Sequence, residues 1–168
     1  MIFDRFYPQE WVDSTYEIDW KFWQKKGIRG AIFDIDNTLV PHGAPADTQV
    51  KTLFHHLHHM GIRTCLLSNN KEPRVSSFAT EVNSPYIYKA GKPAVRNYKK
   101  AMKLMGTTPQ STLFVGDQLF TDIYGANRTG IYGILVKPIN PKEEIQIVLK
   151  RYLEAVVLHF YQQQNKNK

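Results

Sequence analysis

Short apolar runs alternate with longer amphipathic stretches along most of this chain. A run that is apolar throughout suits a strand buried on both faces, and apolar residues three or four positions apart suit a helix with one buried face. The predicted strands lie near residues 31–33, 62–67, 86–88, 111–115 and 131–136. The predicted helices lie near residues 47–61, 72–80, 93–105 and 121–128. This alternation predicts an α/β fold with a doubly wound parallel sheet.

The helix predicted to begin at about Asp47 shows the helical spacing well. Its apolar positions, which should face the core, are Val50, Leu53, Phe54, Leu57 and Met60. Its other faces carry four histidines, His55, His56, His58 and His59. Pairs of them could ligate a metal, but no cysteine or carboxylate completes a ligand set. Solvent-exposed histidines are therefore the simpler interpretation.

The lead-in over residues 1–29 is rich in aromatic side chains, and residues 16–26 could form a short helix. These aromatic side chains could cover one side of the core, because large aromatic surfaces contribute strongly to packing. Trp20, Phe22 and Trp23 also stand among lysines, a combination that suits a membrane interface. Both interpretations stay open at this point.

The C-terminal region predicts one more helix, over residues 141–161. Its apolar positions at helical spacing are Ile145, Val148, Leu149, Tyr152, Leu153, Val156 and Phe160. We expect this face to pack on the sheet. The polar tail over residues 162–168 is expected to fray.

The length of 168 residues suits one domain with a proper core. We expect a single domain made of the lead-in (1–29), a core (30–136) and a C-terminal helix with its tail (137–168). The 22 Lys and Arg residues outnumber the 15 Asp and Glu residues, and the net charge of +7 favours anionic partners. The single cysteine, Cys65, cannot form an internal disulfide and lies in an apolar run, where we expect a core role.

Two carboxylates stand one residue apart at the end of the first predicted strand. Asp34 and Asp36 could converge on one ligand where the backbone turns, although an Asx turn with an Asp cap has the same pattern. Close carboxylates repel unless a cation joins them, and Mg²⁺ is commonly held by carboxylates with substrate phosphate and water. The pair therefore favours a phosphoryl-handling site.

Polar residues follow three later strands in the same way. Ser68 follows the run over residues 62–67, Lys92 stands in a Gly-Lys-Pro sequence, and Asp117 follows Gly116. Taken singly, Ser68 could cap a loop, Lys92 could be a surface lysine, and Asp117 could be a turn residue. All of these would have to coincide by chance at strand ends, which argues for a shared site.

Together these residues resemble the motifs of the haloacid dehalogenase (HAD) superfamily. The sequence from Asp34 to Thr38 resembles its first motif, DxDx[TV], Ser68 and Lys92 resemble the second and third, and the Gly-Asp-Gln sequence that runs on to Asp122 resembles the fourth. The Lys-Pro and Gly-Asp-Gln details are similar to subclass IIIA, and within it to the YqeG-like group related to phosphatidylglycerophosphatase.

The resemblance implies a HAD fold with strand order 3-2-1-4-5, in which the first and fourth motifs face the same crevice. HAD enzymes that act on small metabolites commonly carry a cap domain, but residues 40–62 fit only a turn and one helix and residues 69–91 only one helix and one short strand, so we expect a capless, open site. Asp34 would be the nucleophile that forms an aspartyl phosphate, and Asp36 the general acid and base. Mg²⁺ would be held by the side chains of Asp34 and Asp117 and the backbone carbonyl of Asp36. Asp122 would support these ligands without binding the metal itself.

The resemblance also implies how the substrate phosphate is held. Ser68, Asn69 and Lys92 would bind its oxygens, where preorganised charge is the main catalytic resource. Lys92 would in addition offset the repulsion between Asp34 and Asp117. Lys89 is the alternative lysine, but Lys92 with its following proline matches the subclass better.

The predicted function is that of a Mg²⁺-dependent phosphomonoesterase. The substrate would be a phosphomonoester on a large anionic molecule, with phosphatidylglycerophosphate as the leading candidate and peripheral contact with a membrane. The basic residues that motivate this flank the third motif, namely Lys89, Arg96, Lys99, Lys100 and Lys103. The alternative is a basic scaffold on the same fold that binds nucleic acid or protein. Without a signal-peptide pattern or a run of roughly 20 apolar residues, we expect a cytoplasmic protein.

Overall fold

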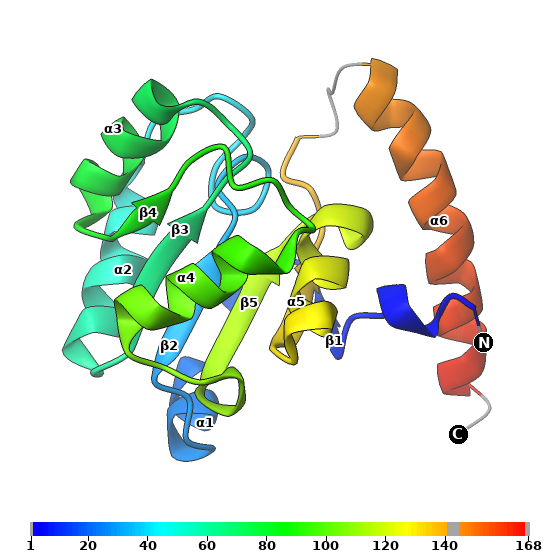
Figure 1. The fold of residues 1–168 in the computed structure, drawn as a ribbon, viewed down its shortest axis with the longest axis horizontal. Coiled ribbons are helices and arrows are strands. Elements are labelled where there is room, and N and C mark those ends of the chain that lie inside the picture. Colours follow the sequence, from blue (N-terminus) through cyan, green and yellow to red (C-terminus); the bar gives the residue numbers. More distant parts are fainter. Residues whose placement is uncertain (1, 141–144, 167–168) are drawn as a thin grey trace.

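The computed structural model describes residues 2–140 and 145–166 and has a six-stranded, all-parallel sheet at its centre (Figure 1). The strand order is β1-β6-β5-β2-β3-β4. The strands are β1 (Glu10–Val12), β2 (Gly30–Phe33), β3 (Arg63–Leu67), β4 (Tyr86–Ile87), β5 (Thr112–Gly116) and β6 (Tyr132–Val136). The five strands predicted from the sequence have the predicted order, with β2 between β3 and β5, and β1 is an additional edge strand that the pattern did not predict.

Helices cover both faces of the sheet. They are α1 (Trp20–Lys25), α2 (Thr48–His59), α3 (Glu72–Val82), α4 (Val95–Met105), α5 (Tyr124–Thr129) and α6 (Ile145–Lys166). The helices α2 and α3 pack on one face and α4 and α5 on the other. The helix predicted over residues 121–128 begins instead with a π-helical turn, Leu119–Ile123, that runs into α5.

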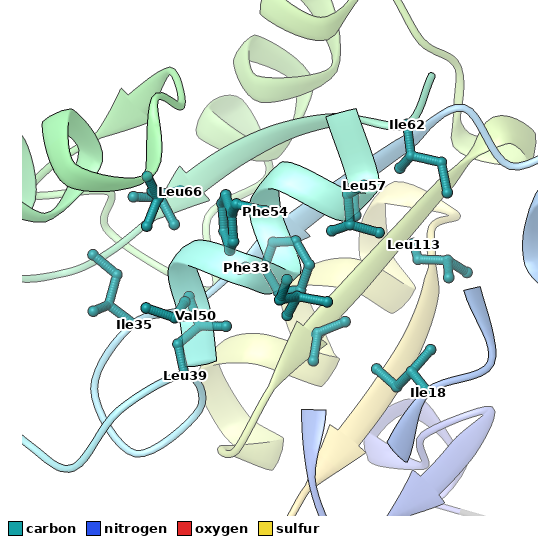
Figure 2. Packing of buried hydrophobic residues seen from close by; sticks show 14 of the residues in the cluster. Ile18, Phe33, Ile35, Leu39, Val50, Phe54, Leu57, Ile62, Leu66 and Leu113 are labelled. Carbon is teal, nitrogen blue, oxygen red and sulfur yellow. The ribbon is translucent and has the colours of Figure 1, made fainter. Parts of the chain in front are cut away.

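The core forms because side chains of a strand alternate between the two faces of the sheet. Phe33 of β2 packs against Phe54 of α2, with ring centroids 5.1 Å apart, on the face shown in Figure 2. The preceding residue, Ile32, lies on the opposite face with Tyr98 of α4. Both faces of the central strands are thus buried, which explains their uninterrupted apolar runs.

The lead-in supports the loop that follows β2. The hydroxyl of Thr15 donates to the carbonyl oxygen of Thr38 at 2.8 Å, and the hydroxyl of Tyr16 donates to that of Leu39 at 2.7 Å. The expected helix over residues 16–26 is shorter, because only α1 within it is helical. Trp20 is buried against Phe33, which confirms the core interpretation for this side chain.

The helix α6 differs from its prediction in length and in orientation. It continues to Lys166, so most of the tail that was expected to fray is helical, and its predicted start at residues 141–144 lies outside the described residues. Val157 is buried, but the expected core-facing side chains over residues 148–160 are exposed, from Val148 at 39% to Tyr152 at 71%. The prediction that this apolar face packs on the sheet was therefore wrong for the described residues 148–160.

No inserted domain covers the carboxyl ends of the strands in the described residues. The connection from β2 to β3 holds α2, and the connection from β3 to β4 holds α3. The capless prediction is confirmed. Within the described ranges, no helix combines the length and apolar character that crossing a bilayer requires.

Candidate active site

Four of the predicted site residues meet at the carboxyl ends of neighbouring strands. Asp34 follows β2, Ser68 follows β3, Lys92 follows β4 and Asp117 follows β5 directly. Beside them lies a cavity of about 370 Å³. It is lined by Asp34, Asp36, Asn37, His42, Ser68, Asn69, Asn70, Lys92, Gln118, Thr121 and Lys150. Segments far apart in the sequence thus contribute to one concave site.

Lys92 joins two of the acidic side chains in the floor of the cavity. Its ammonium group donates to Oδ1 of Asp34 at 2.8 Å and to Oδ1 of Asp122 at 2.6 Å. All three side chains are buried. Burial by itself lowers the pKa of Lys92, but the charges of Asp122 and Asp34 outweigh burial and raise that pKa, so Lys92 stays protonated. The alternative, Lys89, is exposed and lies outside the lining of the cavity.

Asp117 has a different set of partners from the one predicted. Its Oδ1 accepts a hydrogen bond from the Thr38 hydroxyl at 3.0 Å, and its Oδ2 pairs with the guanidinium of Arg151 from α6. The same guanidinium also donates to the backbone carbonyl of Asp117. The cation that pairs directly with Asp117 is therefore Arg151, whereas Lys92 pairs with Asp34 and Asp122.

Asp122 holds the backbone that carries Asp117. Its Oδ2 accepts from the backbone N–H groups of Asp117 and Gln118, both at 3.1 Å. This approach requires glycine before Asp117, because a Cβ atom at Gly116 would lie 2.5 Å from that oxygen. The fourth motif therefore has a physical reason. Gly116 leaves room for the Asp122 carboxylate, which in turn positions Asp117.

Asp34, Asp117 and Asp122 form a cluster that could hold a cation. Ligand oxygens of the three lie within 4.8 Å of one another, and all three residues are buried. A set of hard carboxylate oxygens suits Mg²⁺ better than metals that prefer nitrogen or sulfur ligands. Asp36 does not contribute its carboxylate to this cluster, which is consistent with the predicted use of its backbone carbonyl only.

The charges of this cluster are incompletely balanced. Burial raises the pKa of Asp34 well above its usual value, and the charges of Asp122 and Asp117 add to this rise while Lys92 opposes it. Burial and the charge of Asp122 raise the pKa of Asp117 to about 6, against the opposing effect of Arg151. Both shifts indicate that the site would gain from an additional positive charge.

Asp36 is held away from the other acids by a second group of contacts. Its Oδ1 pairs with Nη2 of Arg74 at 2.9 Å and accepts the N–H of Gly43 at 2.8 Å, and Asn70 donates to its Oδ2 at 3.3 Å. Burial would raise the pKa of Asp36, but the Gly43 and Arg74 contacts, with that of Asn70, bring it below its usual value. Asp36 is therefore an ionised carboxylate in this structure.

The predicted phosphate-binding residues line the same cavity. Ser68 is buried, and its hydroxyl oxygen accepts a hydrogen bond from the N–H of Asn70 at 3.1 Å. The hydroxyl proton of Ser68 therefore remains available for donation to another acceptor. Asn69 is exposed, and its side-chain carbonyl accepts the N–H of Lys92 at 2.9 Å. Asn69 thus also fixes the position of the third motif, a role that the sequence did not reveal.

Three charged residues at the site were missed in the sequence, namely Arg74, Lys150 and Arg151. Arg74 lies in α3, and the other two lie in α6 beside Asp117 and Gln118. A basic pair inside an otherwise apolar helix was the available signal for Lys150 and Arg151. Nothing in the spacing connects that pair with an aspartate 34 residues earlier.

The four histidines of α2 do not join the site. His55, His56 and His59 are exposed, and His58 contacts the hydroxyl of Thr64 at 2.9 Å. The prediction of solvent-exposed histidines is confirmed for His55, His56 and His59 but not for His58, which is half-buried. Cys65 is buried in the core, as predicted.

Comparisons with known proteins agree with this geometry. The family model described as HAD-hydrolase-like matches residues 89–140. The chain is 33% identical over 154 residues to a Bacillus subtilis protein named "Probable phosphatase YqeG", an alignment that covers 91% of this chain and 90% of that protein.

Two further similarities extend the comparison. The chain is 28% identical over 162 residues to the Arabidopsis thaliana protein named phosphatidylglycerophosphate phosphatase 1, covering 90% of this chain but only 47% of that protein. Among solved structures, a Legionella pneumophila protein described as a "putative HAD superfamily (subfamily III A) hydrolase" superposes with a TM-score of 0.54 at 14% identity, over 73% of this chain and 75% of that one. The structural similarity supports the fold.

Proposed function

This chain belongs to the HAD-like hydrolase family, and we propose that it is a Mg²⁺-dependent phosphomonoesterase that works through an aspartyl phosphate on Asp34. The observation that carries this proposal is the convergence of Asp34, Ser68 and Lys92 on one cavity, with Asp117 clustered beside Asp34. A scaffold that only binds nucleic acid or protein would have no need for buried acids of raised pKa at that place.

In this proposal, Asp34 attacks a phosphorus atom bound in the cavity. Its carboxylate lies at the cavity floor and is oriented by Lys92. In the first step an oxygen of Asp34 bonds to phosphorus while the ester P–O bond breaks and the alcohol leaves with a proton. In the second step water attacks the aspartyl phosphate, which releases inorganic phosphate and restores Asp34.

Asp34, Asp117 and the backbone carbonyl of Asp36 would hold Mg²⁺, which neutralises phosphate charge and the repulsion between the acids when it is bound. The residues fit this role because three buried carboxylates face only two cations, Lys92 and Arg151, among the described residues. Ser68 and Lys92 would donate hydrogen bonds to the oxygens of the transferring group.

Asp36 is ready for the second half of the reaction as it stands. An ionised carboxylate can accept the proton of the attacking water. For the first half it must carry a proton to the leaving oxygen, and the Arg74 contact opposes its protonation. We propose that substrate in the cavity weakens this contact, because the negative phosphate competes for the guanidinium.

The chemistry is tested by phosphate release from an aryl phosphate with Mg²⁺ and with a chelator, and by trapping the aspartyl phosphate. Asp34→Asn should abolish both signals, and Asp36→Asn should lose about 10²–10⁴ in turnover because proton transfer is lost. The exposed Asp13→Asn is the matched control and should behave as wild type. Wild-type turnover in Asp34→Asn would exclude the mechanism.

We further propose a lipid phosphomonoester as substrate, with phosphatidylglycerophosphate as the first candidate. The plant relative named for this activity supports the proposal, although this chain spans about half of its length. The absence of an inserted cap from the described residues and the exposed cations of α4 also favour a large anionic substrate. These cations are Arg96, Lys99, Lys100 and Lys103. The test compares kcat/KM for the lipid in vesicles with that for soluble phosphomonoesters.

A further inference from the structure

The outer face of α6 is the main apolar surface on the described part of the chain. It is defined by Val148, Leu149, Tyr152, Leu153, Val156 and Phe160, which are 39–71% exposed. Their spacing places them along one side of the helix. The opposite side faces the protein, where Val157 packs with Leu119 and Ile123 and Arg151 pairs with Asp117. The charged side chains of Arg151 and Glu154 thus face inward, while most of the apolar side chains of the helix face outward.

Such a face is uncommon on a monomeric soluble protein. Exposed apolar area costs roughly 25 cal/mol per Å² relative to burial, and contiguous exposed patches commonly mark interaction sites. Figure 1 shows α6 along the side of the molecule, next to the N-terminal segment. Phe160, at the C-terminal end of this face, stacks on Phe3 with ring centroids 5.7 Å apart, so the helix is held in place there while the other five side chains of the face stay 39–71% exposed.

The charges around this face suit an anionic partner. Glu154 is the single acidic residue in the described helix, and it is buried against Arg151. The described cations of α6 are Lys150, Arg151 and Lys166. With a net charge of +7 on the whole chain, an acidic membrane would attract this surface rather than repel it.

The face begins beside the catalytic cavity. Lys150 lines the cavity and donates to Oε1 of Gln118 at 3.0 Å, while its neighbours along the outer side, Leu149 and Leu153, are exposed. A phosphomonoester in a lipid layer carries its phosphate next to apolar chains. A cavity that adjoins an apolar helix face matches this arrangement, whereas contact with a second copy of the chain would not require it.

We propose that the outer face of α6 docks on an anionic phospholipid surface and presents the cavity to phosphomonoester headgroups in it. The choice of phosphomonoester headgroups rests on the proposed phosphatase function. The docking itself rests only on the exposed face of α6. It replaces the membrane contact that the sequence suggested at Trp20, Phe22 and Trp23. Trp20 is buried, and α1 lies at the amino ends of the strands, opposite the cavity.

The test is co-sedimentation with vesicles of phosphatidylcholine and phosphatidylglycerol, and with phosphatidylcholine alone. The double substitution Leu149→Gln and Leu153→Gln keeps helix propensity and should weaken binding to the anionic vesicles by at least about tenfold, from the apolar area lost. The matched control is Leu104→Gln, a leucine of α4 that is 50% exposed, and it should bind as wild type. All variants should hydrolyse a soluble aryl phosphate equally.

Equal sedimentation of the double variant and wild type would overturn the proposal. So would absence of wild-type binding combined with a dimer, measured by analytical ultracentrifugation, that the double substitution dissociates, because the occupant would then be a second copy. Asp34→Asn should still bind vesicles. Vesicle binding without hydrolysis of any phosphomonoester would refute the phosphatase proposal alone, and hydrolysis without vesicle binding would refute the docking alone.

Discussion

Arg151 occupies the position beside Asp117 where a metal ion would compete with it. Both carboxylate oxygens of Asp117 are engaged, Oδ1 by Thr38 and Oδ2 by Arg151. If Asp117 ligates Mg²⁺, at least one of these contacts has to be released. We therefore expect the substitution Arg151→Met, which keeps the apolar stem and removes the charge, to strengthen Mg²⁺ binding.

The magnitude follows from the contact that is released. A hydrogen bond to a charged group contributes about 1.5–3 kcal/mol. Because 1.4 kcal/mol corresponds to about a tenfold change in an equilibrium constant, the Kd for Mg²⁺ should fall by about 10- to 100-fold in Arg151→Met. The same substitution should destabilise the metal-free protein by about 3–5 kcal/mol, since it leaves Asp117 buried without its cationic partner.

Isothermal titration with MgCl₂ measures the affinity, and urea unfolding without metal measures the stability. Lys150→Met is the matched control, because it removes one positive charge from the same helix at a side chain that contacts Gln118 rather than Asp117. A general electrostatic effect would appear in both variants. Equal Mg²⁺ affinity in wild type and Arg151→Met, or weaker binding in Arg151→Met, would refute the competition.

Three further predictions use other features of the structure. Because burial raises the pKa of Asp117 to about 6 in the folded state, its protonated form favours folding, and its contribution to stability is lost as pH rises from about 4 through 6. In urea unfolding without metal, the free energy of unfolding of wild type should therefore fall by about 3 kcal/mol relative to that of Asp117→Asn between pH 4 and pH 7. A difference between the two proteins that does not change with pH would contradict this. Gly116→Ala should displace Asp122, which should lower the free energy of unfolding in urea by about 1–3 kcal/mol and weaken Mg²⁺ binding measured by calorimetry. Unchanged Mg²⁺ affinity would contradict the role of Asp122 in positioning Asp117. Burial raises the pKa of Cys65 to about 12, so it should react with a thiol reagent only after unfolding; rapid labelling of the native protein would contradict its burial.

The strands and most helices could be predicted because their signals are local. Each central strand is buried on both faces, and its apolar run is visible in a few consecutive residues. The helix α2 shows an Asp47 cap whose carboxylate accepts the N–H of Val50 at 2.9 Å, followed by helical spacing. Asp34, Ser68, Lys92 and Asp117 could be placed together because parallel strands bring their carboxyl ends to one edge.

The partners of those residues could not be read from the sequence, because charge pairing depends on which elements become neighbours in space. Arg74 and Arg151 stand 38 and 34 positions from the aspartates that they contact, and other cations were equally available to any pattern. The strand β1 was missed because its three residues, Glu10–Val12, begin with a charged side chain and are all half-buried, so no apolar run marks the strand.

The helix α6 shows most clearly what the tertiary structure alone decided. Its sequence determined that it is a helix with one apolar stripe, and periodicity alone then favours burial of that stripe. In the folded protein, the side that carries Arg151 and Glu154 faces inward instead, where Arg151 reaches the buried Asp117 and Glu154 accepts the N–H of Phe120 at 3.4 Å. The inward orientation gives the buried Asp117 a cationic partner, which a desolvated charge needs, and apolar side chains can remain partly exposed without any such partner.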